Sequence, residues 1–104
     1  MPALIYVSYP CVEGAKFDMD YYLNTHMKIV EKHWTSYGMK DWTVVQFQKD
    51  DPSGQNVQAI MTWESTEAFD KAIAANIPEV MEDVKHYSPE VMPVRYYAQV
   101  MAKG

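Results

Sequence analysis

The stretch that most constrains the fold is residues 17–37, where apolar side chains recur at the spacing of one helix face. Asp18 is the expected N-cap, because its short side chain can accept a hydrogen bond from the free N–H groups of the first turn. The side chains expected to face the core are Met19, Tyr22, Leu23, His26, Met27, Val30, His33, Trp34 and Tyr37. The pattern predicts one amphipathic helix that carries two histidines on its buried side.

Four runs are rich in β-branched and aromatic residues and are typical of strands. They lie at 3–9, 39–49, 56–64 and 91–101. The polar turn at 50–55 joins the second run to the third, so these two are expected to form an antiparallel hairpin. Pro93 predicts an edge position or a bulge for the last run, because proline cannot donate to a strand ladder.

A second helical segment is expected after the third strand. Ser65 is its predicted N-cap, and apolar residues recur at helical spacing up to Ile77. Pro78 interrupts the pattern, so the helix should bend or restart around Asn76 and continue to about residue 87. His86, near the end of this second piece, is interpreted as a residue that the helix dipole favours.

The predicted order is strand, helix, strand, strand, helix, strand, in one domain that spans 1–104. This order favours an α+β fold: a ferredoxin-like βαββαβ sandwich with a four-stranded antiparallel sheet and two helices over one face. Several strands are apolar on both sides, and the face without helices would expose a larger apolar patch than a monomer tolerates. We therefore expect a homodimer whose two sheets pack face to face.

Charge and cysteine content exclude several classes of protein. Nine basic and fourteen acidic residues give a net charge of −5, and no basic cluster occurs, so nucleic-acid binding is not expected. The single Cys11 excludes an internal disulfide. The apolar run near the N-terminus is too short for a signal peptide or a membrane span, so no membrane interaction is expected. These features predict a cytoplasmic location.

His26 is the strongest candidate for chemistry, because it lies near the middle of the apolar stripe and a buried imidazole needs a polar partner. A histidine in such a place is also often a satisfied core residue without a catalytic role. Tyr22 lies one turn earlier, where the two rings can meet. His33, nearer the helix end, has easier access to water and is the second candidate.

No metal or cofactor site is expected. His26 and His33 are about two turns and roughly 10 Å apart along a helix axis, whereas metal ligands on one helix need a spacing of three or four residues. Neither helix is preceded by a glycine-rich loop of the kind that binds nucleotide phosphates.

The segment Phe17-Asp18-Met19-Asp20-Tyr21-Tyr22-Leu23-Asn24-Thr25-His26-Met27, followed by Val30, Trp34 and Gly38, resembles the signature of the EthD family. Its core is the pattern F-D-x-x-Y-Y-x-x-x-H. One departure from the family signature is Lys28, where members often have proline after the His26-Met27 pair. The resemblance implies a dimeric α/β barrel with a cavity between each sheet and its own helices, beneath the helix that carries His26.

The resemblance also implies a function. The family is commonly placed among oxidoreductases, and relatives on the same barrel include cofactor-independent monooxygenases, lactone isomerases and polyketide cyclases. The leading hypothesis is therefore a small enzyme, without a bound cofactor, that acts on an apolar oxygenated or aromatic metabolite with His26 as general acid/base. Tyr22 or Tyr96 would orient the imidazole or donate to an oxyanion.

The predicted substrate-binding residues are Trp34, Met61, Trp63, Phe69, Tyr96 and His33. The alternative to an enzyme is a non-catalytic dimer that binds or carries an apolar metabolite and assists a partner oxygenase. In that case His26 would supply a hydrogen bond and would not move a proton.

Overall fold

The computed structural model describes residues 2–104 and contains four strands and a series of helical segments. The strands are β1 (Ala3–Pro10), β2 (Met39–Gln46), β3 (Gln55–Trp63) and β4 (Val94–Gln99). The first helical segment comprises α1 (Met19–Tyr21), η1 (Tyr22–His26), α2 (Met27–Trp34) and η2 (Thr35–Tyr37). The second comprises α3 (Thr66–Ala75), α4 (Pro78–Met81) and η3 (Asp83–His86). No helix within these residues is long and apolar enough to cross a membrane.

The predicted ferredoxin-like α+β fold is confirmed by the sheet. The strand order is β2-β3-β1-β4, and all three neighbouring pairs are antiparallel. β2 and β3 form the predicted hairpin, and β4 occupies the edge position that Pro93 indicated. Both β2 and β4 are shorter than the sequence pattern suggested.

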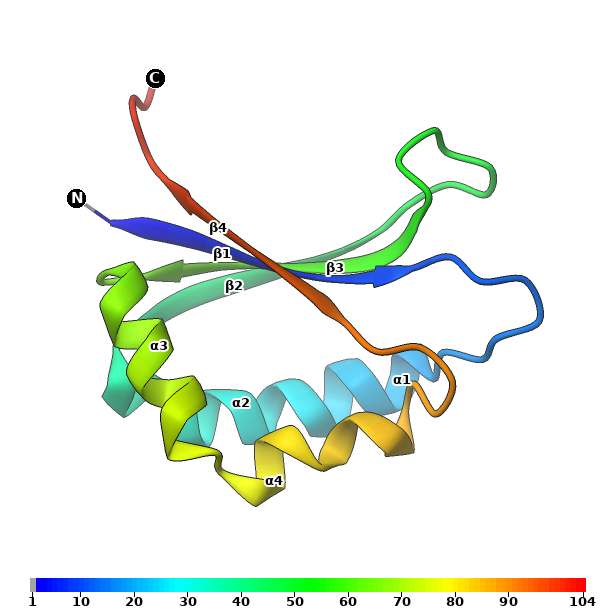
Figure 1. Ribbon diagram of the computed structural model, residues 1–104, viewed down its shortest axis with the longest axis horizontal. Helices are drawn as coiled ribbons and strands as arrows, with labels where there is room; N and C mark the ends of the chain where they lie inside the picture. The colour runs from blue at the N-terminus through cyan, green and yellow to red at the C-terminus, as the bar shows by residue number, and fades with distance from the viewer. Residues whose placement is uncertain (1) are drawn as a thin grey trace.

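All the helices cover one face of the sheet, and the other face carries no helix (Figure 1). The strand register places Tyr6 of β1 opposite Ile60 of β3 and Tyr96 of β4, so these three side chains lie in a row across the bare face. Tyr96 is 49% exposed. The centre of the bare face is therefore apolar and partly accessible to solvent.

The first helical segment contains a π-helical turn that the sequence pattern did not reveal. Asp18 is the N-cap as predicted, and its side chain accepts a hydrogen bond from the backbone N–H of Tyr21. In η1 the N–H of Met27 bonds to the carbonyl of Tyr22, five residues earlier. Leu23, expected in the core, lies within this wider turn and is 36% exposed, whereas Met27, Val30 and Trp34 after the turn are buried as predicted. Tyr37, at the end of η2, is also exposed, contrary to the prediction.

The second helical segment is interrupted where the sequence indicated. Ser65 is the N-cap of α3, and its hydroxyl accepts a hydrogen bond from the N–H of Ala68. Asn76 ends α3 in the left-handed conformation, with φ of 47°. Pro78 then starts α4, where its missing N–H is not needed. The chain thus turns and places η3 beside the first helical segment.

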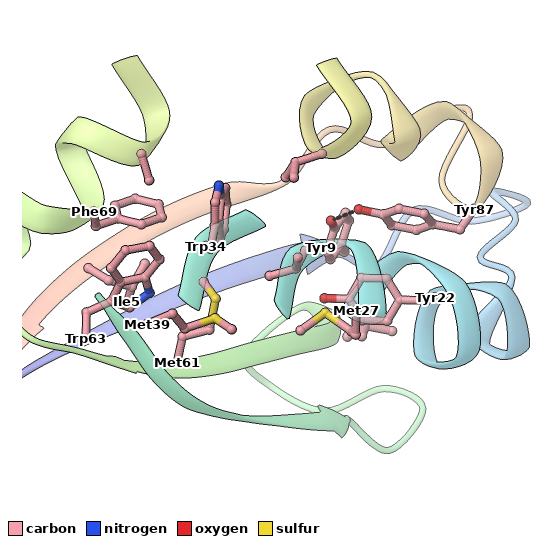
Figure 2. Packing of buried hydrophobic residues seen from close by; sticks show 14 residues of the cluster. Ile5, Tyr9, Tyr22, Met27, Trp34, Met39, Met61, Trp63, Phe69 and Tyr87 are labelled. Atoms are coloured by element: carbon pink, nitrogen blue, oxygen red, sulfur yellow. Dashed lines mark hydrogen bonds between the residues drawn. The ribbon is translucent and has the colours of Figure 1, made fainter. Parts of the chain in front are cut away.

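The core lies between the sheet and the helices and has two different ends (Figure 2). At one end Trp34, Trp63 and Phe69 pack edge to face, with ring centroids 5.1–5.6 Å apart. At the other end the rings of Tyr9, Tyr22 and Tyr87 gather and bring their hydroxyl groups into the interior. The aromatic side chains of the chain thus fill one end of the core, and at the other end their hydroxyl groups make the core polar.

Candidate functional site

A cavity of about 140 Å³ lies between the sheet and the helices, next to the tyrosine-rich end of the core. Its floor comes from β1 and β3, and its roof from the first helical segment and from α3, α4 and η3. Most of the lining is aliphatic. Met92, which is 75% exposed, and Arg95, which is also exposed, lie at the side that opens to solvent. The site is therefore an apolar pocket with polar groups at defined points, as expected for a small-molecule site.

His26 lines this cavity and is only 6% exposed. Its Nδ1 lies 3.0 Å from Oδ2 of Asp83 in η3. A carboxylate oxygen can only accept, so this hydrogen bond requires a proton on Nδ1. In the neutral imidazole Nε2 is then the free acceptor.

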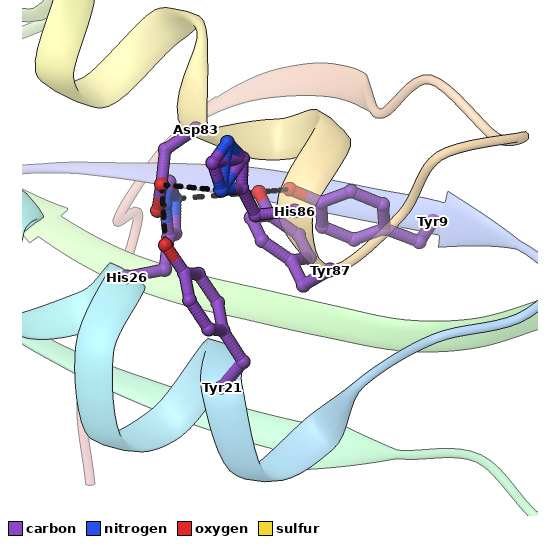
Figure 3. Close-up of polar contacts among 6 residues, drawn as sticks. All are labelled: Tyr9, Tyr21, His26, Asp83, His86 and Tyr87. Carbon is purple, nitrogen blue, oxygen red and sulfur yellow. Dashed lines mark hydrogen bonds and ion pairs between the residues drawn. The ribbon is translucent and has the colours of Figure 1, made fainter.

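Asp83 is itself held in place by a second donor. The Tyr21 hydroxyl donates to Oδ1 of Asp83 at 2.6 Å, so the two carboxylate oxygens receive different partners (Figure 3). The Nδ1 of His86 lies 4.0 Å from the same Oδ1. The side chain of Asp83 is 11% exposed. This arrangement fixes the orientation of the carboxylate and, through it, that of the imidazole.

The other ring nitrogen of His26 faces a pair of tyrosines. The Tyr87 hydroxyl lies 3.3 Å from Nε2 and also hydrogen-bonds to the hydroxyl of Tyr9 (Figure 3). Every group is satisfied when Tyr9 donates to Tyr87, Tyr87 donates to Nε2, and Nδ1 donates to Asp83. The 3.3 Å separation is long for a hydrogen bond, so a ligand oxygen can compete for Nε2.

Burial sets the protonation of these groups. It lowers the pKa of His26 below 6.5, although the hydrogen bond and charge of Asp83 act in the opposite direction. Burial likewise raises the pKa of Tyr9, Tyr22 and Tyr87 above the ordinary tyrosine value. Near neutral pH the imidazole is therefore neutral and able to accept a proton, and the tyrosines keep their O–H groups.

Tyr22 stacks on His26, as the sequence predicted. The two ring centroids lie 5.5 Å apart with an interplanar angle of 14°. Both residues belong to η1, whose wider turn keeps positions 22 and 26 on the same side of the helix. Tyr22 thus supports the imidazole by ring contact, and the hydroxyl next to Nε2 belongs to Tyr87.

The predicted substrate-binding residues separate into two groups. Trp34 and Met61 line the cavity together with His26 and Tyr22. Trp63 and Phe69 are fully buried in the neighbouring core cluster and do not reach the cavity, because they pack on each other and on Trp34.

The two remaining predicted substrate-binding residues, Tyr96 and His33, also lie outside the pocket. Tyr96 points to the bare face of the sheet, because it pairs with Tyr6 on the side opposite the helices. Its neighbours Arg95 and Tyr97 face the helices instead. His33 lies outside the cavity, with its Nε2 3.3 Å from the Glu79 carboxylate.

Four further residues belong to the site although the sequence pattern did not indicate them: Tyr9, Asp83, Tyr87 and Arg95. Tyr9 and Tyr87 were assigned to a strand end and a helix end, where nothing in the local pattern indicated that their hydroxyls would meet. Asp83 is an acidic residue near a helix end, a common surface position. A usable signal was its place three residues before His86, a spacing that puts an acidic and a basic side chain on the same face of a helical turn.

In the described part of the chain, no group of three His, Cys, Asp or Glu side chains is placed so that it could hold a metal ion. The nearest arrangement is Asp83 between His26 and His86, where the carboxylate accepts from one ring and the other is 4.0 Å away. The expectation that the protein works without a cofactor stays a prediction.

Comparison with known proteins identifies the fold of the chain through solved structures, but it identifies no family from the sequence. No family model and no curated protein matches the chain. Among solved structures, an EthD-like protein from Ralstonia eutropha JMP134 superimposes with a TM-score of 0.84 and 24% identity. The match covers 99% of this chain and 95% of that one. The chain therefore has the fold of EthD-like proteins, in agreement with the resemblance of residues 17–38.

Two more distant structures share the fold. SnoaB from Streptomyces nogalater, described as a cofactor-independent oxygenase, matches with a TM-score of 0.65 and 10% identity, over 98% of this chain and 95% of that one. A dimeric ferredoxin-like protein from an uncultured marine organism matches with a TM-score of 0.58 and 12% identity, over the full length of both chains. At these identities the likeness shows the fold alone.

Proposed function

We propose that this protein is a small enzyme that acts, without a bound cofactor, on an apolar oxygenated or aromatic molecule. The observation that carries the proposal is the imidazole of His26, which lines an apolar cavity while Asp83 holds its Nδ1. The fold shared with an EthD-like protein and with a cofactor-independent oxygenase supports the same class of function.

His26 is the proposed general acid/base. Asp83 keeps the proton on Nδ1, so Nε2 can take a proton from a substrate C–H or O–H group and return it to another atom. A positioned group of this kind contributes on the order of 10²–10⁴-fold to a rate. The Tyr87 hydroxyl, which lies beside Nε2, would donate to the oxygen on which negative charge develops.

The cavity limits the size of the buried part of the substrate. Its volume of about 140 Å³ is close to that of an engineered cavity of about 150 Å³ that binds benzene. One aromatic ring therefore fits inside, and the rest of a larger molecule would extend past Met92 to solvent. Trp34 contributes to the cavity wall, and its buried indole N–H has no hydrogen-bond partner among residues 2–104.

We propose that the chain works as a homodimer with the bare sheet faces packed together. The row of Tyr6, Ile60 and Tyr96 gives this face an apolar centre, and a second copy is the simplest cover for it. The dimeric ferredoxin-like neighbour supports this arrangement. The cytoplasmic location stays a prediction from the sequence.

The test starts with native mass spectrometry of protein purified from its source, which reports both stoichiometry and any retained molecule. Phenols, quinones and lactones with a single ring are then incubated with the protein and followed for product. We expect turnover of at least one class, and a loss of about 10²-fold or more in His26→Gln. A folded His26→Gln protein with full turnover would exclude the proposed role.

A second candidate function is a carrier of an apolar metabolite. The observation that favours it is the Tyr87 hydroxyl next to Nε2, because this partner already satisfies the imidazole. A carrier would return every added ligand chemically unchanged, with an affinity that depends on His26. An enzyme would convert a ligand with a rate that falls as Nε2 is protonated.

A further inference from the structure

Among residues 2–104, Arg95 is the one cationic side chain in the lining of the cavity. It lies on β4, directly opposite Val7 of β1, and both residues face the helices and contribute to the cavity wall. Arg95 is exposed and, with Met92 and Pro93, belongs to the side where the cavity opens to solvent. His26, by contrast, is buried, so the two polar groups occupy different depths of the same pocket.

The guanidinium of Arg95 has no acidic partner. Within residues 2–104 the only ion pairs with nitrogen and oxygen 4.0 Å apart or less involve His26, His33 and His86, and none involves Arg95. The carboxylate that holds His26, that of Asp83, is not part of the cavity lining. The pocket of an acidic protein, with a net charge of −5, therefore presents a positive group and no exposed negative one.

We propose that Arg95 binds an anionic oxygen of the ligand, so that the site takes a single-ring apolar molecule carrying a carboxylate or a phenolate. This inference rests on the proposed function, because it assigns the ligand to the same cavity. The apolar ring would enter toward His26, between Met61 and Val30. The anionic group would stay at the mouth, where a guanidinium can form two parallel hydrogen bonds to a carboxylate.

This orientation is favourable for a charged ligand. An anion at the exposed mouth keeps part of its hydration, whereas an anion beside the buried His26 would lose it. The ring meanwhile removes its apolar surface from water. In the same orientation, the end of the molecule that is farthest from the anionic group lies next to Nε2 of His26.

The experiment compares pairs of probes that differ in charge and hardly in shape. Benzoate is compared with benzamide for the carboxylate, and 4-nitrophenolate with 4-nitroanisole for the phenolate. Binding is measured by calorimetry, and the site is located by the NMR shifts of His26 and of the cavity methionines. The proteins are the unmodified chain, Arg95→Gln, Arg95→Lys and, as a matched control, Lys71→Gln on the exposed side of α3.

We expect at least one anionic probe to bind about tenfold more tightly than its neutral partner, the factor expected for one charge-assisted hydrogen bond. Arg95→Gln should abolish this preference, Arg95→Lys should retain part of it, and Lys71→Gln should leave it unchanged. The pair that shows the preference identifies the anionic group.

Two outcomes would overturn the inference in different ways. Equal binding of charged and neutral probes, or a preference that survives in Arg95→Gln, would reject the role of Arg95 and leave the proposed cavity function intact. Probes that bind without shifting the resonances of His26, or that do not bind at all, would reject the inference and the proposed cavity function together.

Discussion

Oδ2 of Asp83 lies 3.0 Å from Nδ1 of His26, although 57 positions separate the two residues in the sequence. The contact joins η3 to the end of η1 and gives the buried imidazole a fixed tautomer. The two ring nitrogens therefore have different partners. Nδ1 donates to Asp83, whereas Nε2 faces the cavity and the Tyr87 hydroxyl.

Asp83→Asn should lower the pKa of His26 further. The hydrogen bond and charge of Asp83 raise this pKa against the effect of burial, and an asparagine oxygen would keep the bond without the charge. NMR titration of the His26 ring measures the change in pKa. The matched control is Asp20→Asn, an exposed residue in the helical segment that carries His26. An unchanged pKa in Asp83→Asn would contradict the assigned contact.

The unfolding free energy should decrease on acidification because of His26. Its folded-state pKa lies below 6.5, so the unfolded chain binds the proton more readily. The contribution of the neutral His26 to the unfolding free energy is therefore fully present above about pH 6.5. This contribution is lost as the pH falls through the lower, folded-state pKa of His26. Urea unfolding at about pH 8 and about pH 5 should show a smaller loss for His26→Gln than for the unmodified protein. Equal losses in both proteins would disprove this assignment.

Tyr87→Phe should destabilise the protein by about 1–3 kcal/mol, because it leaves the buried Tyr9 hydroxyl without its partner. Tyr37→Phe, at an exposed position, should stay within about 0.5 kcal/mol. A double-mutant cycle of Tyr9→Phe and Tyr87→Phe should give a coupling of about 0.5–3 kcal/mol. Additive effects would show that the two hydroxyls do not interact in solution.

Tyr96→Glu should convert the proposed dimer to a monomer. It places a charge at the apolar centre of the bare sheet face, where a second copy would have to bury it. Sedimentation velocity at micromolar concentration measures the change, and circular dichroism checks the fold. Tyr37→Glu, an exposed tyrosine at the end of η2, should remain dimeric. An unmodified protein that sediments as a monomer would refute the proposal.

The order and type of the elements could be predicted because their signals are local. The caps at Asp18 and Ser65 and the break at Pro78 act on the backbone within a few residues, and the structure has each of them where the pattern indicated. The periodicity of the strands also predicted a sheet that is apolar on both faces. These features do not depend on which distant segment packs against them.

The site was predictable only in part, because its contacts are between distant segments. His26 and Tyr22 were found from their place on one helix face, but Asp83 and Tyr87 meet them only after η3 has folded against η1. The π-helical turn, which contains the exposed Leu23, is also not predicted by a regular helical pattern. For β4, alternation separated Tyr96 from Arg95 correctly, but it could not tell which side the helices would cover.

The most direct test of the central claim is the position of a bound ring relative to His26. The measurement is the set of nuclear Overhauser effects between the protons of added p-cresol and the protein in solution. The account predicts effects from the ring protons to Hε1 of His26 and to the side chains of Met61 and Val30, which line the same cavity. Bound p-cresol with effects to other parts of the protein, and none to His26, would contradict it.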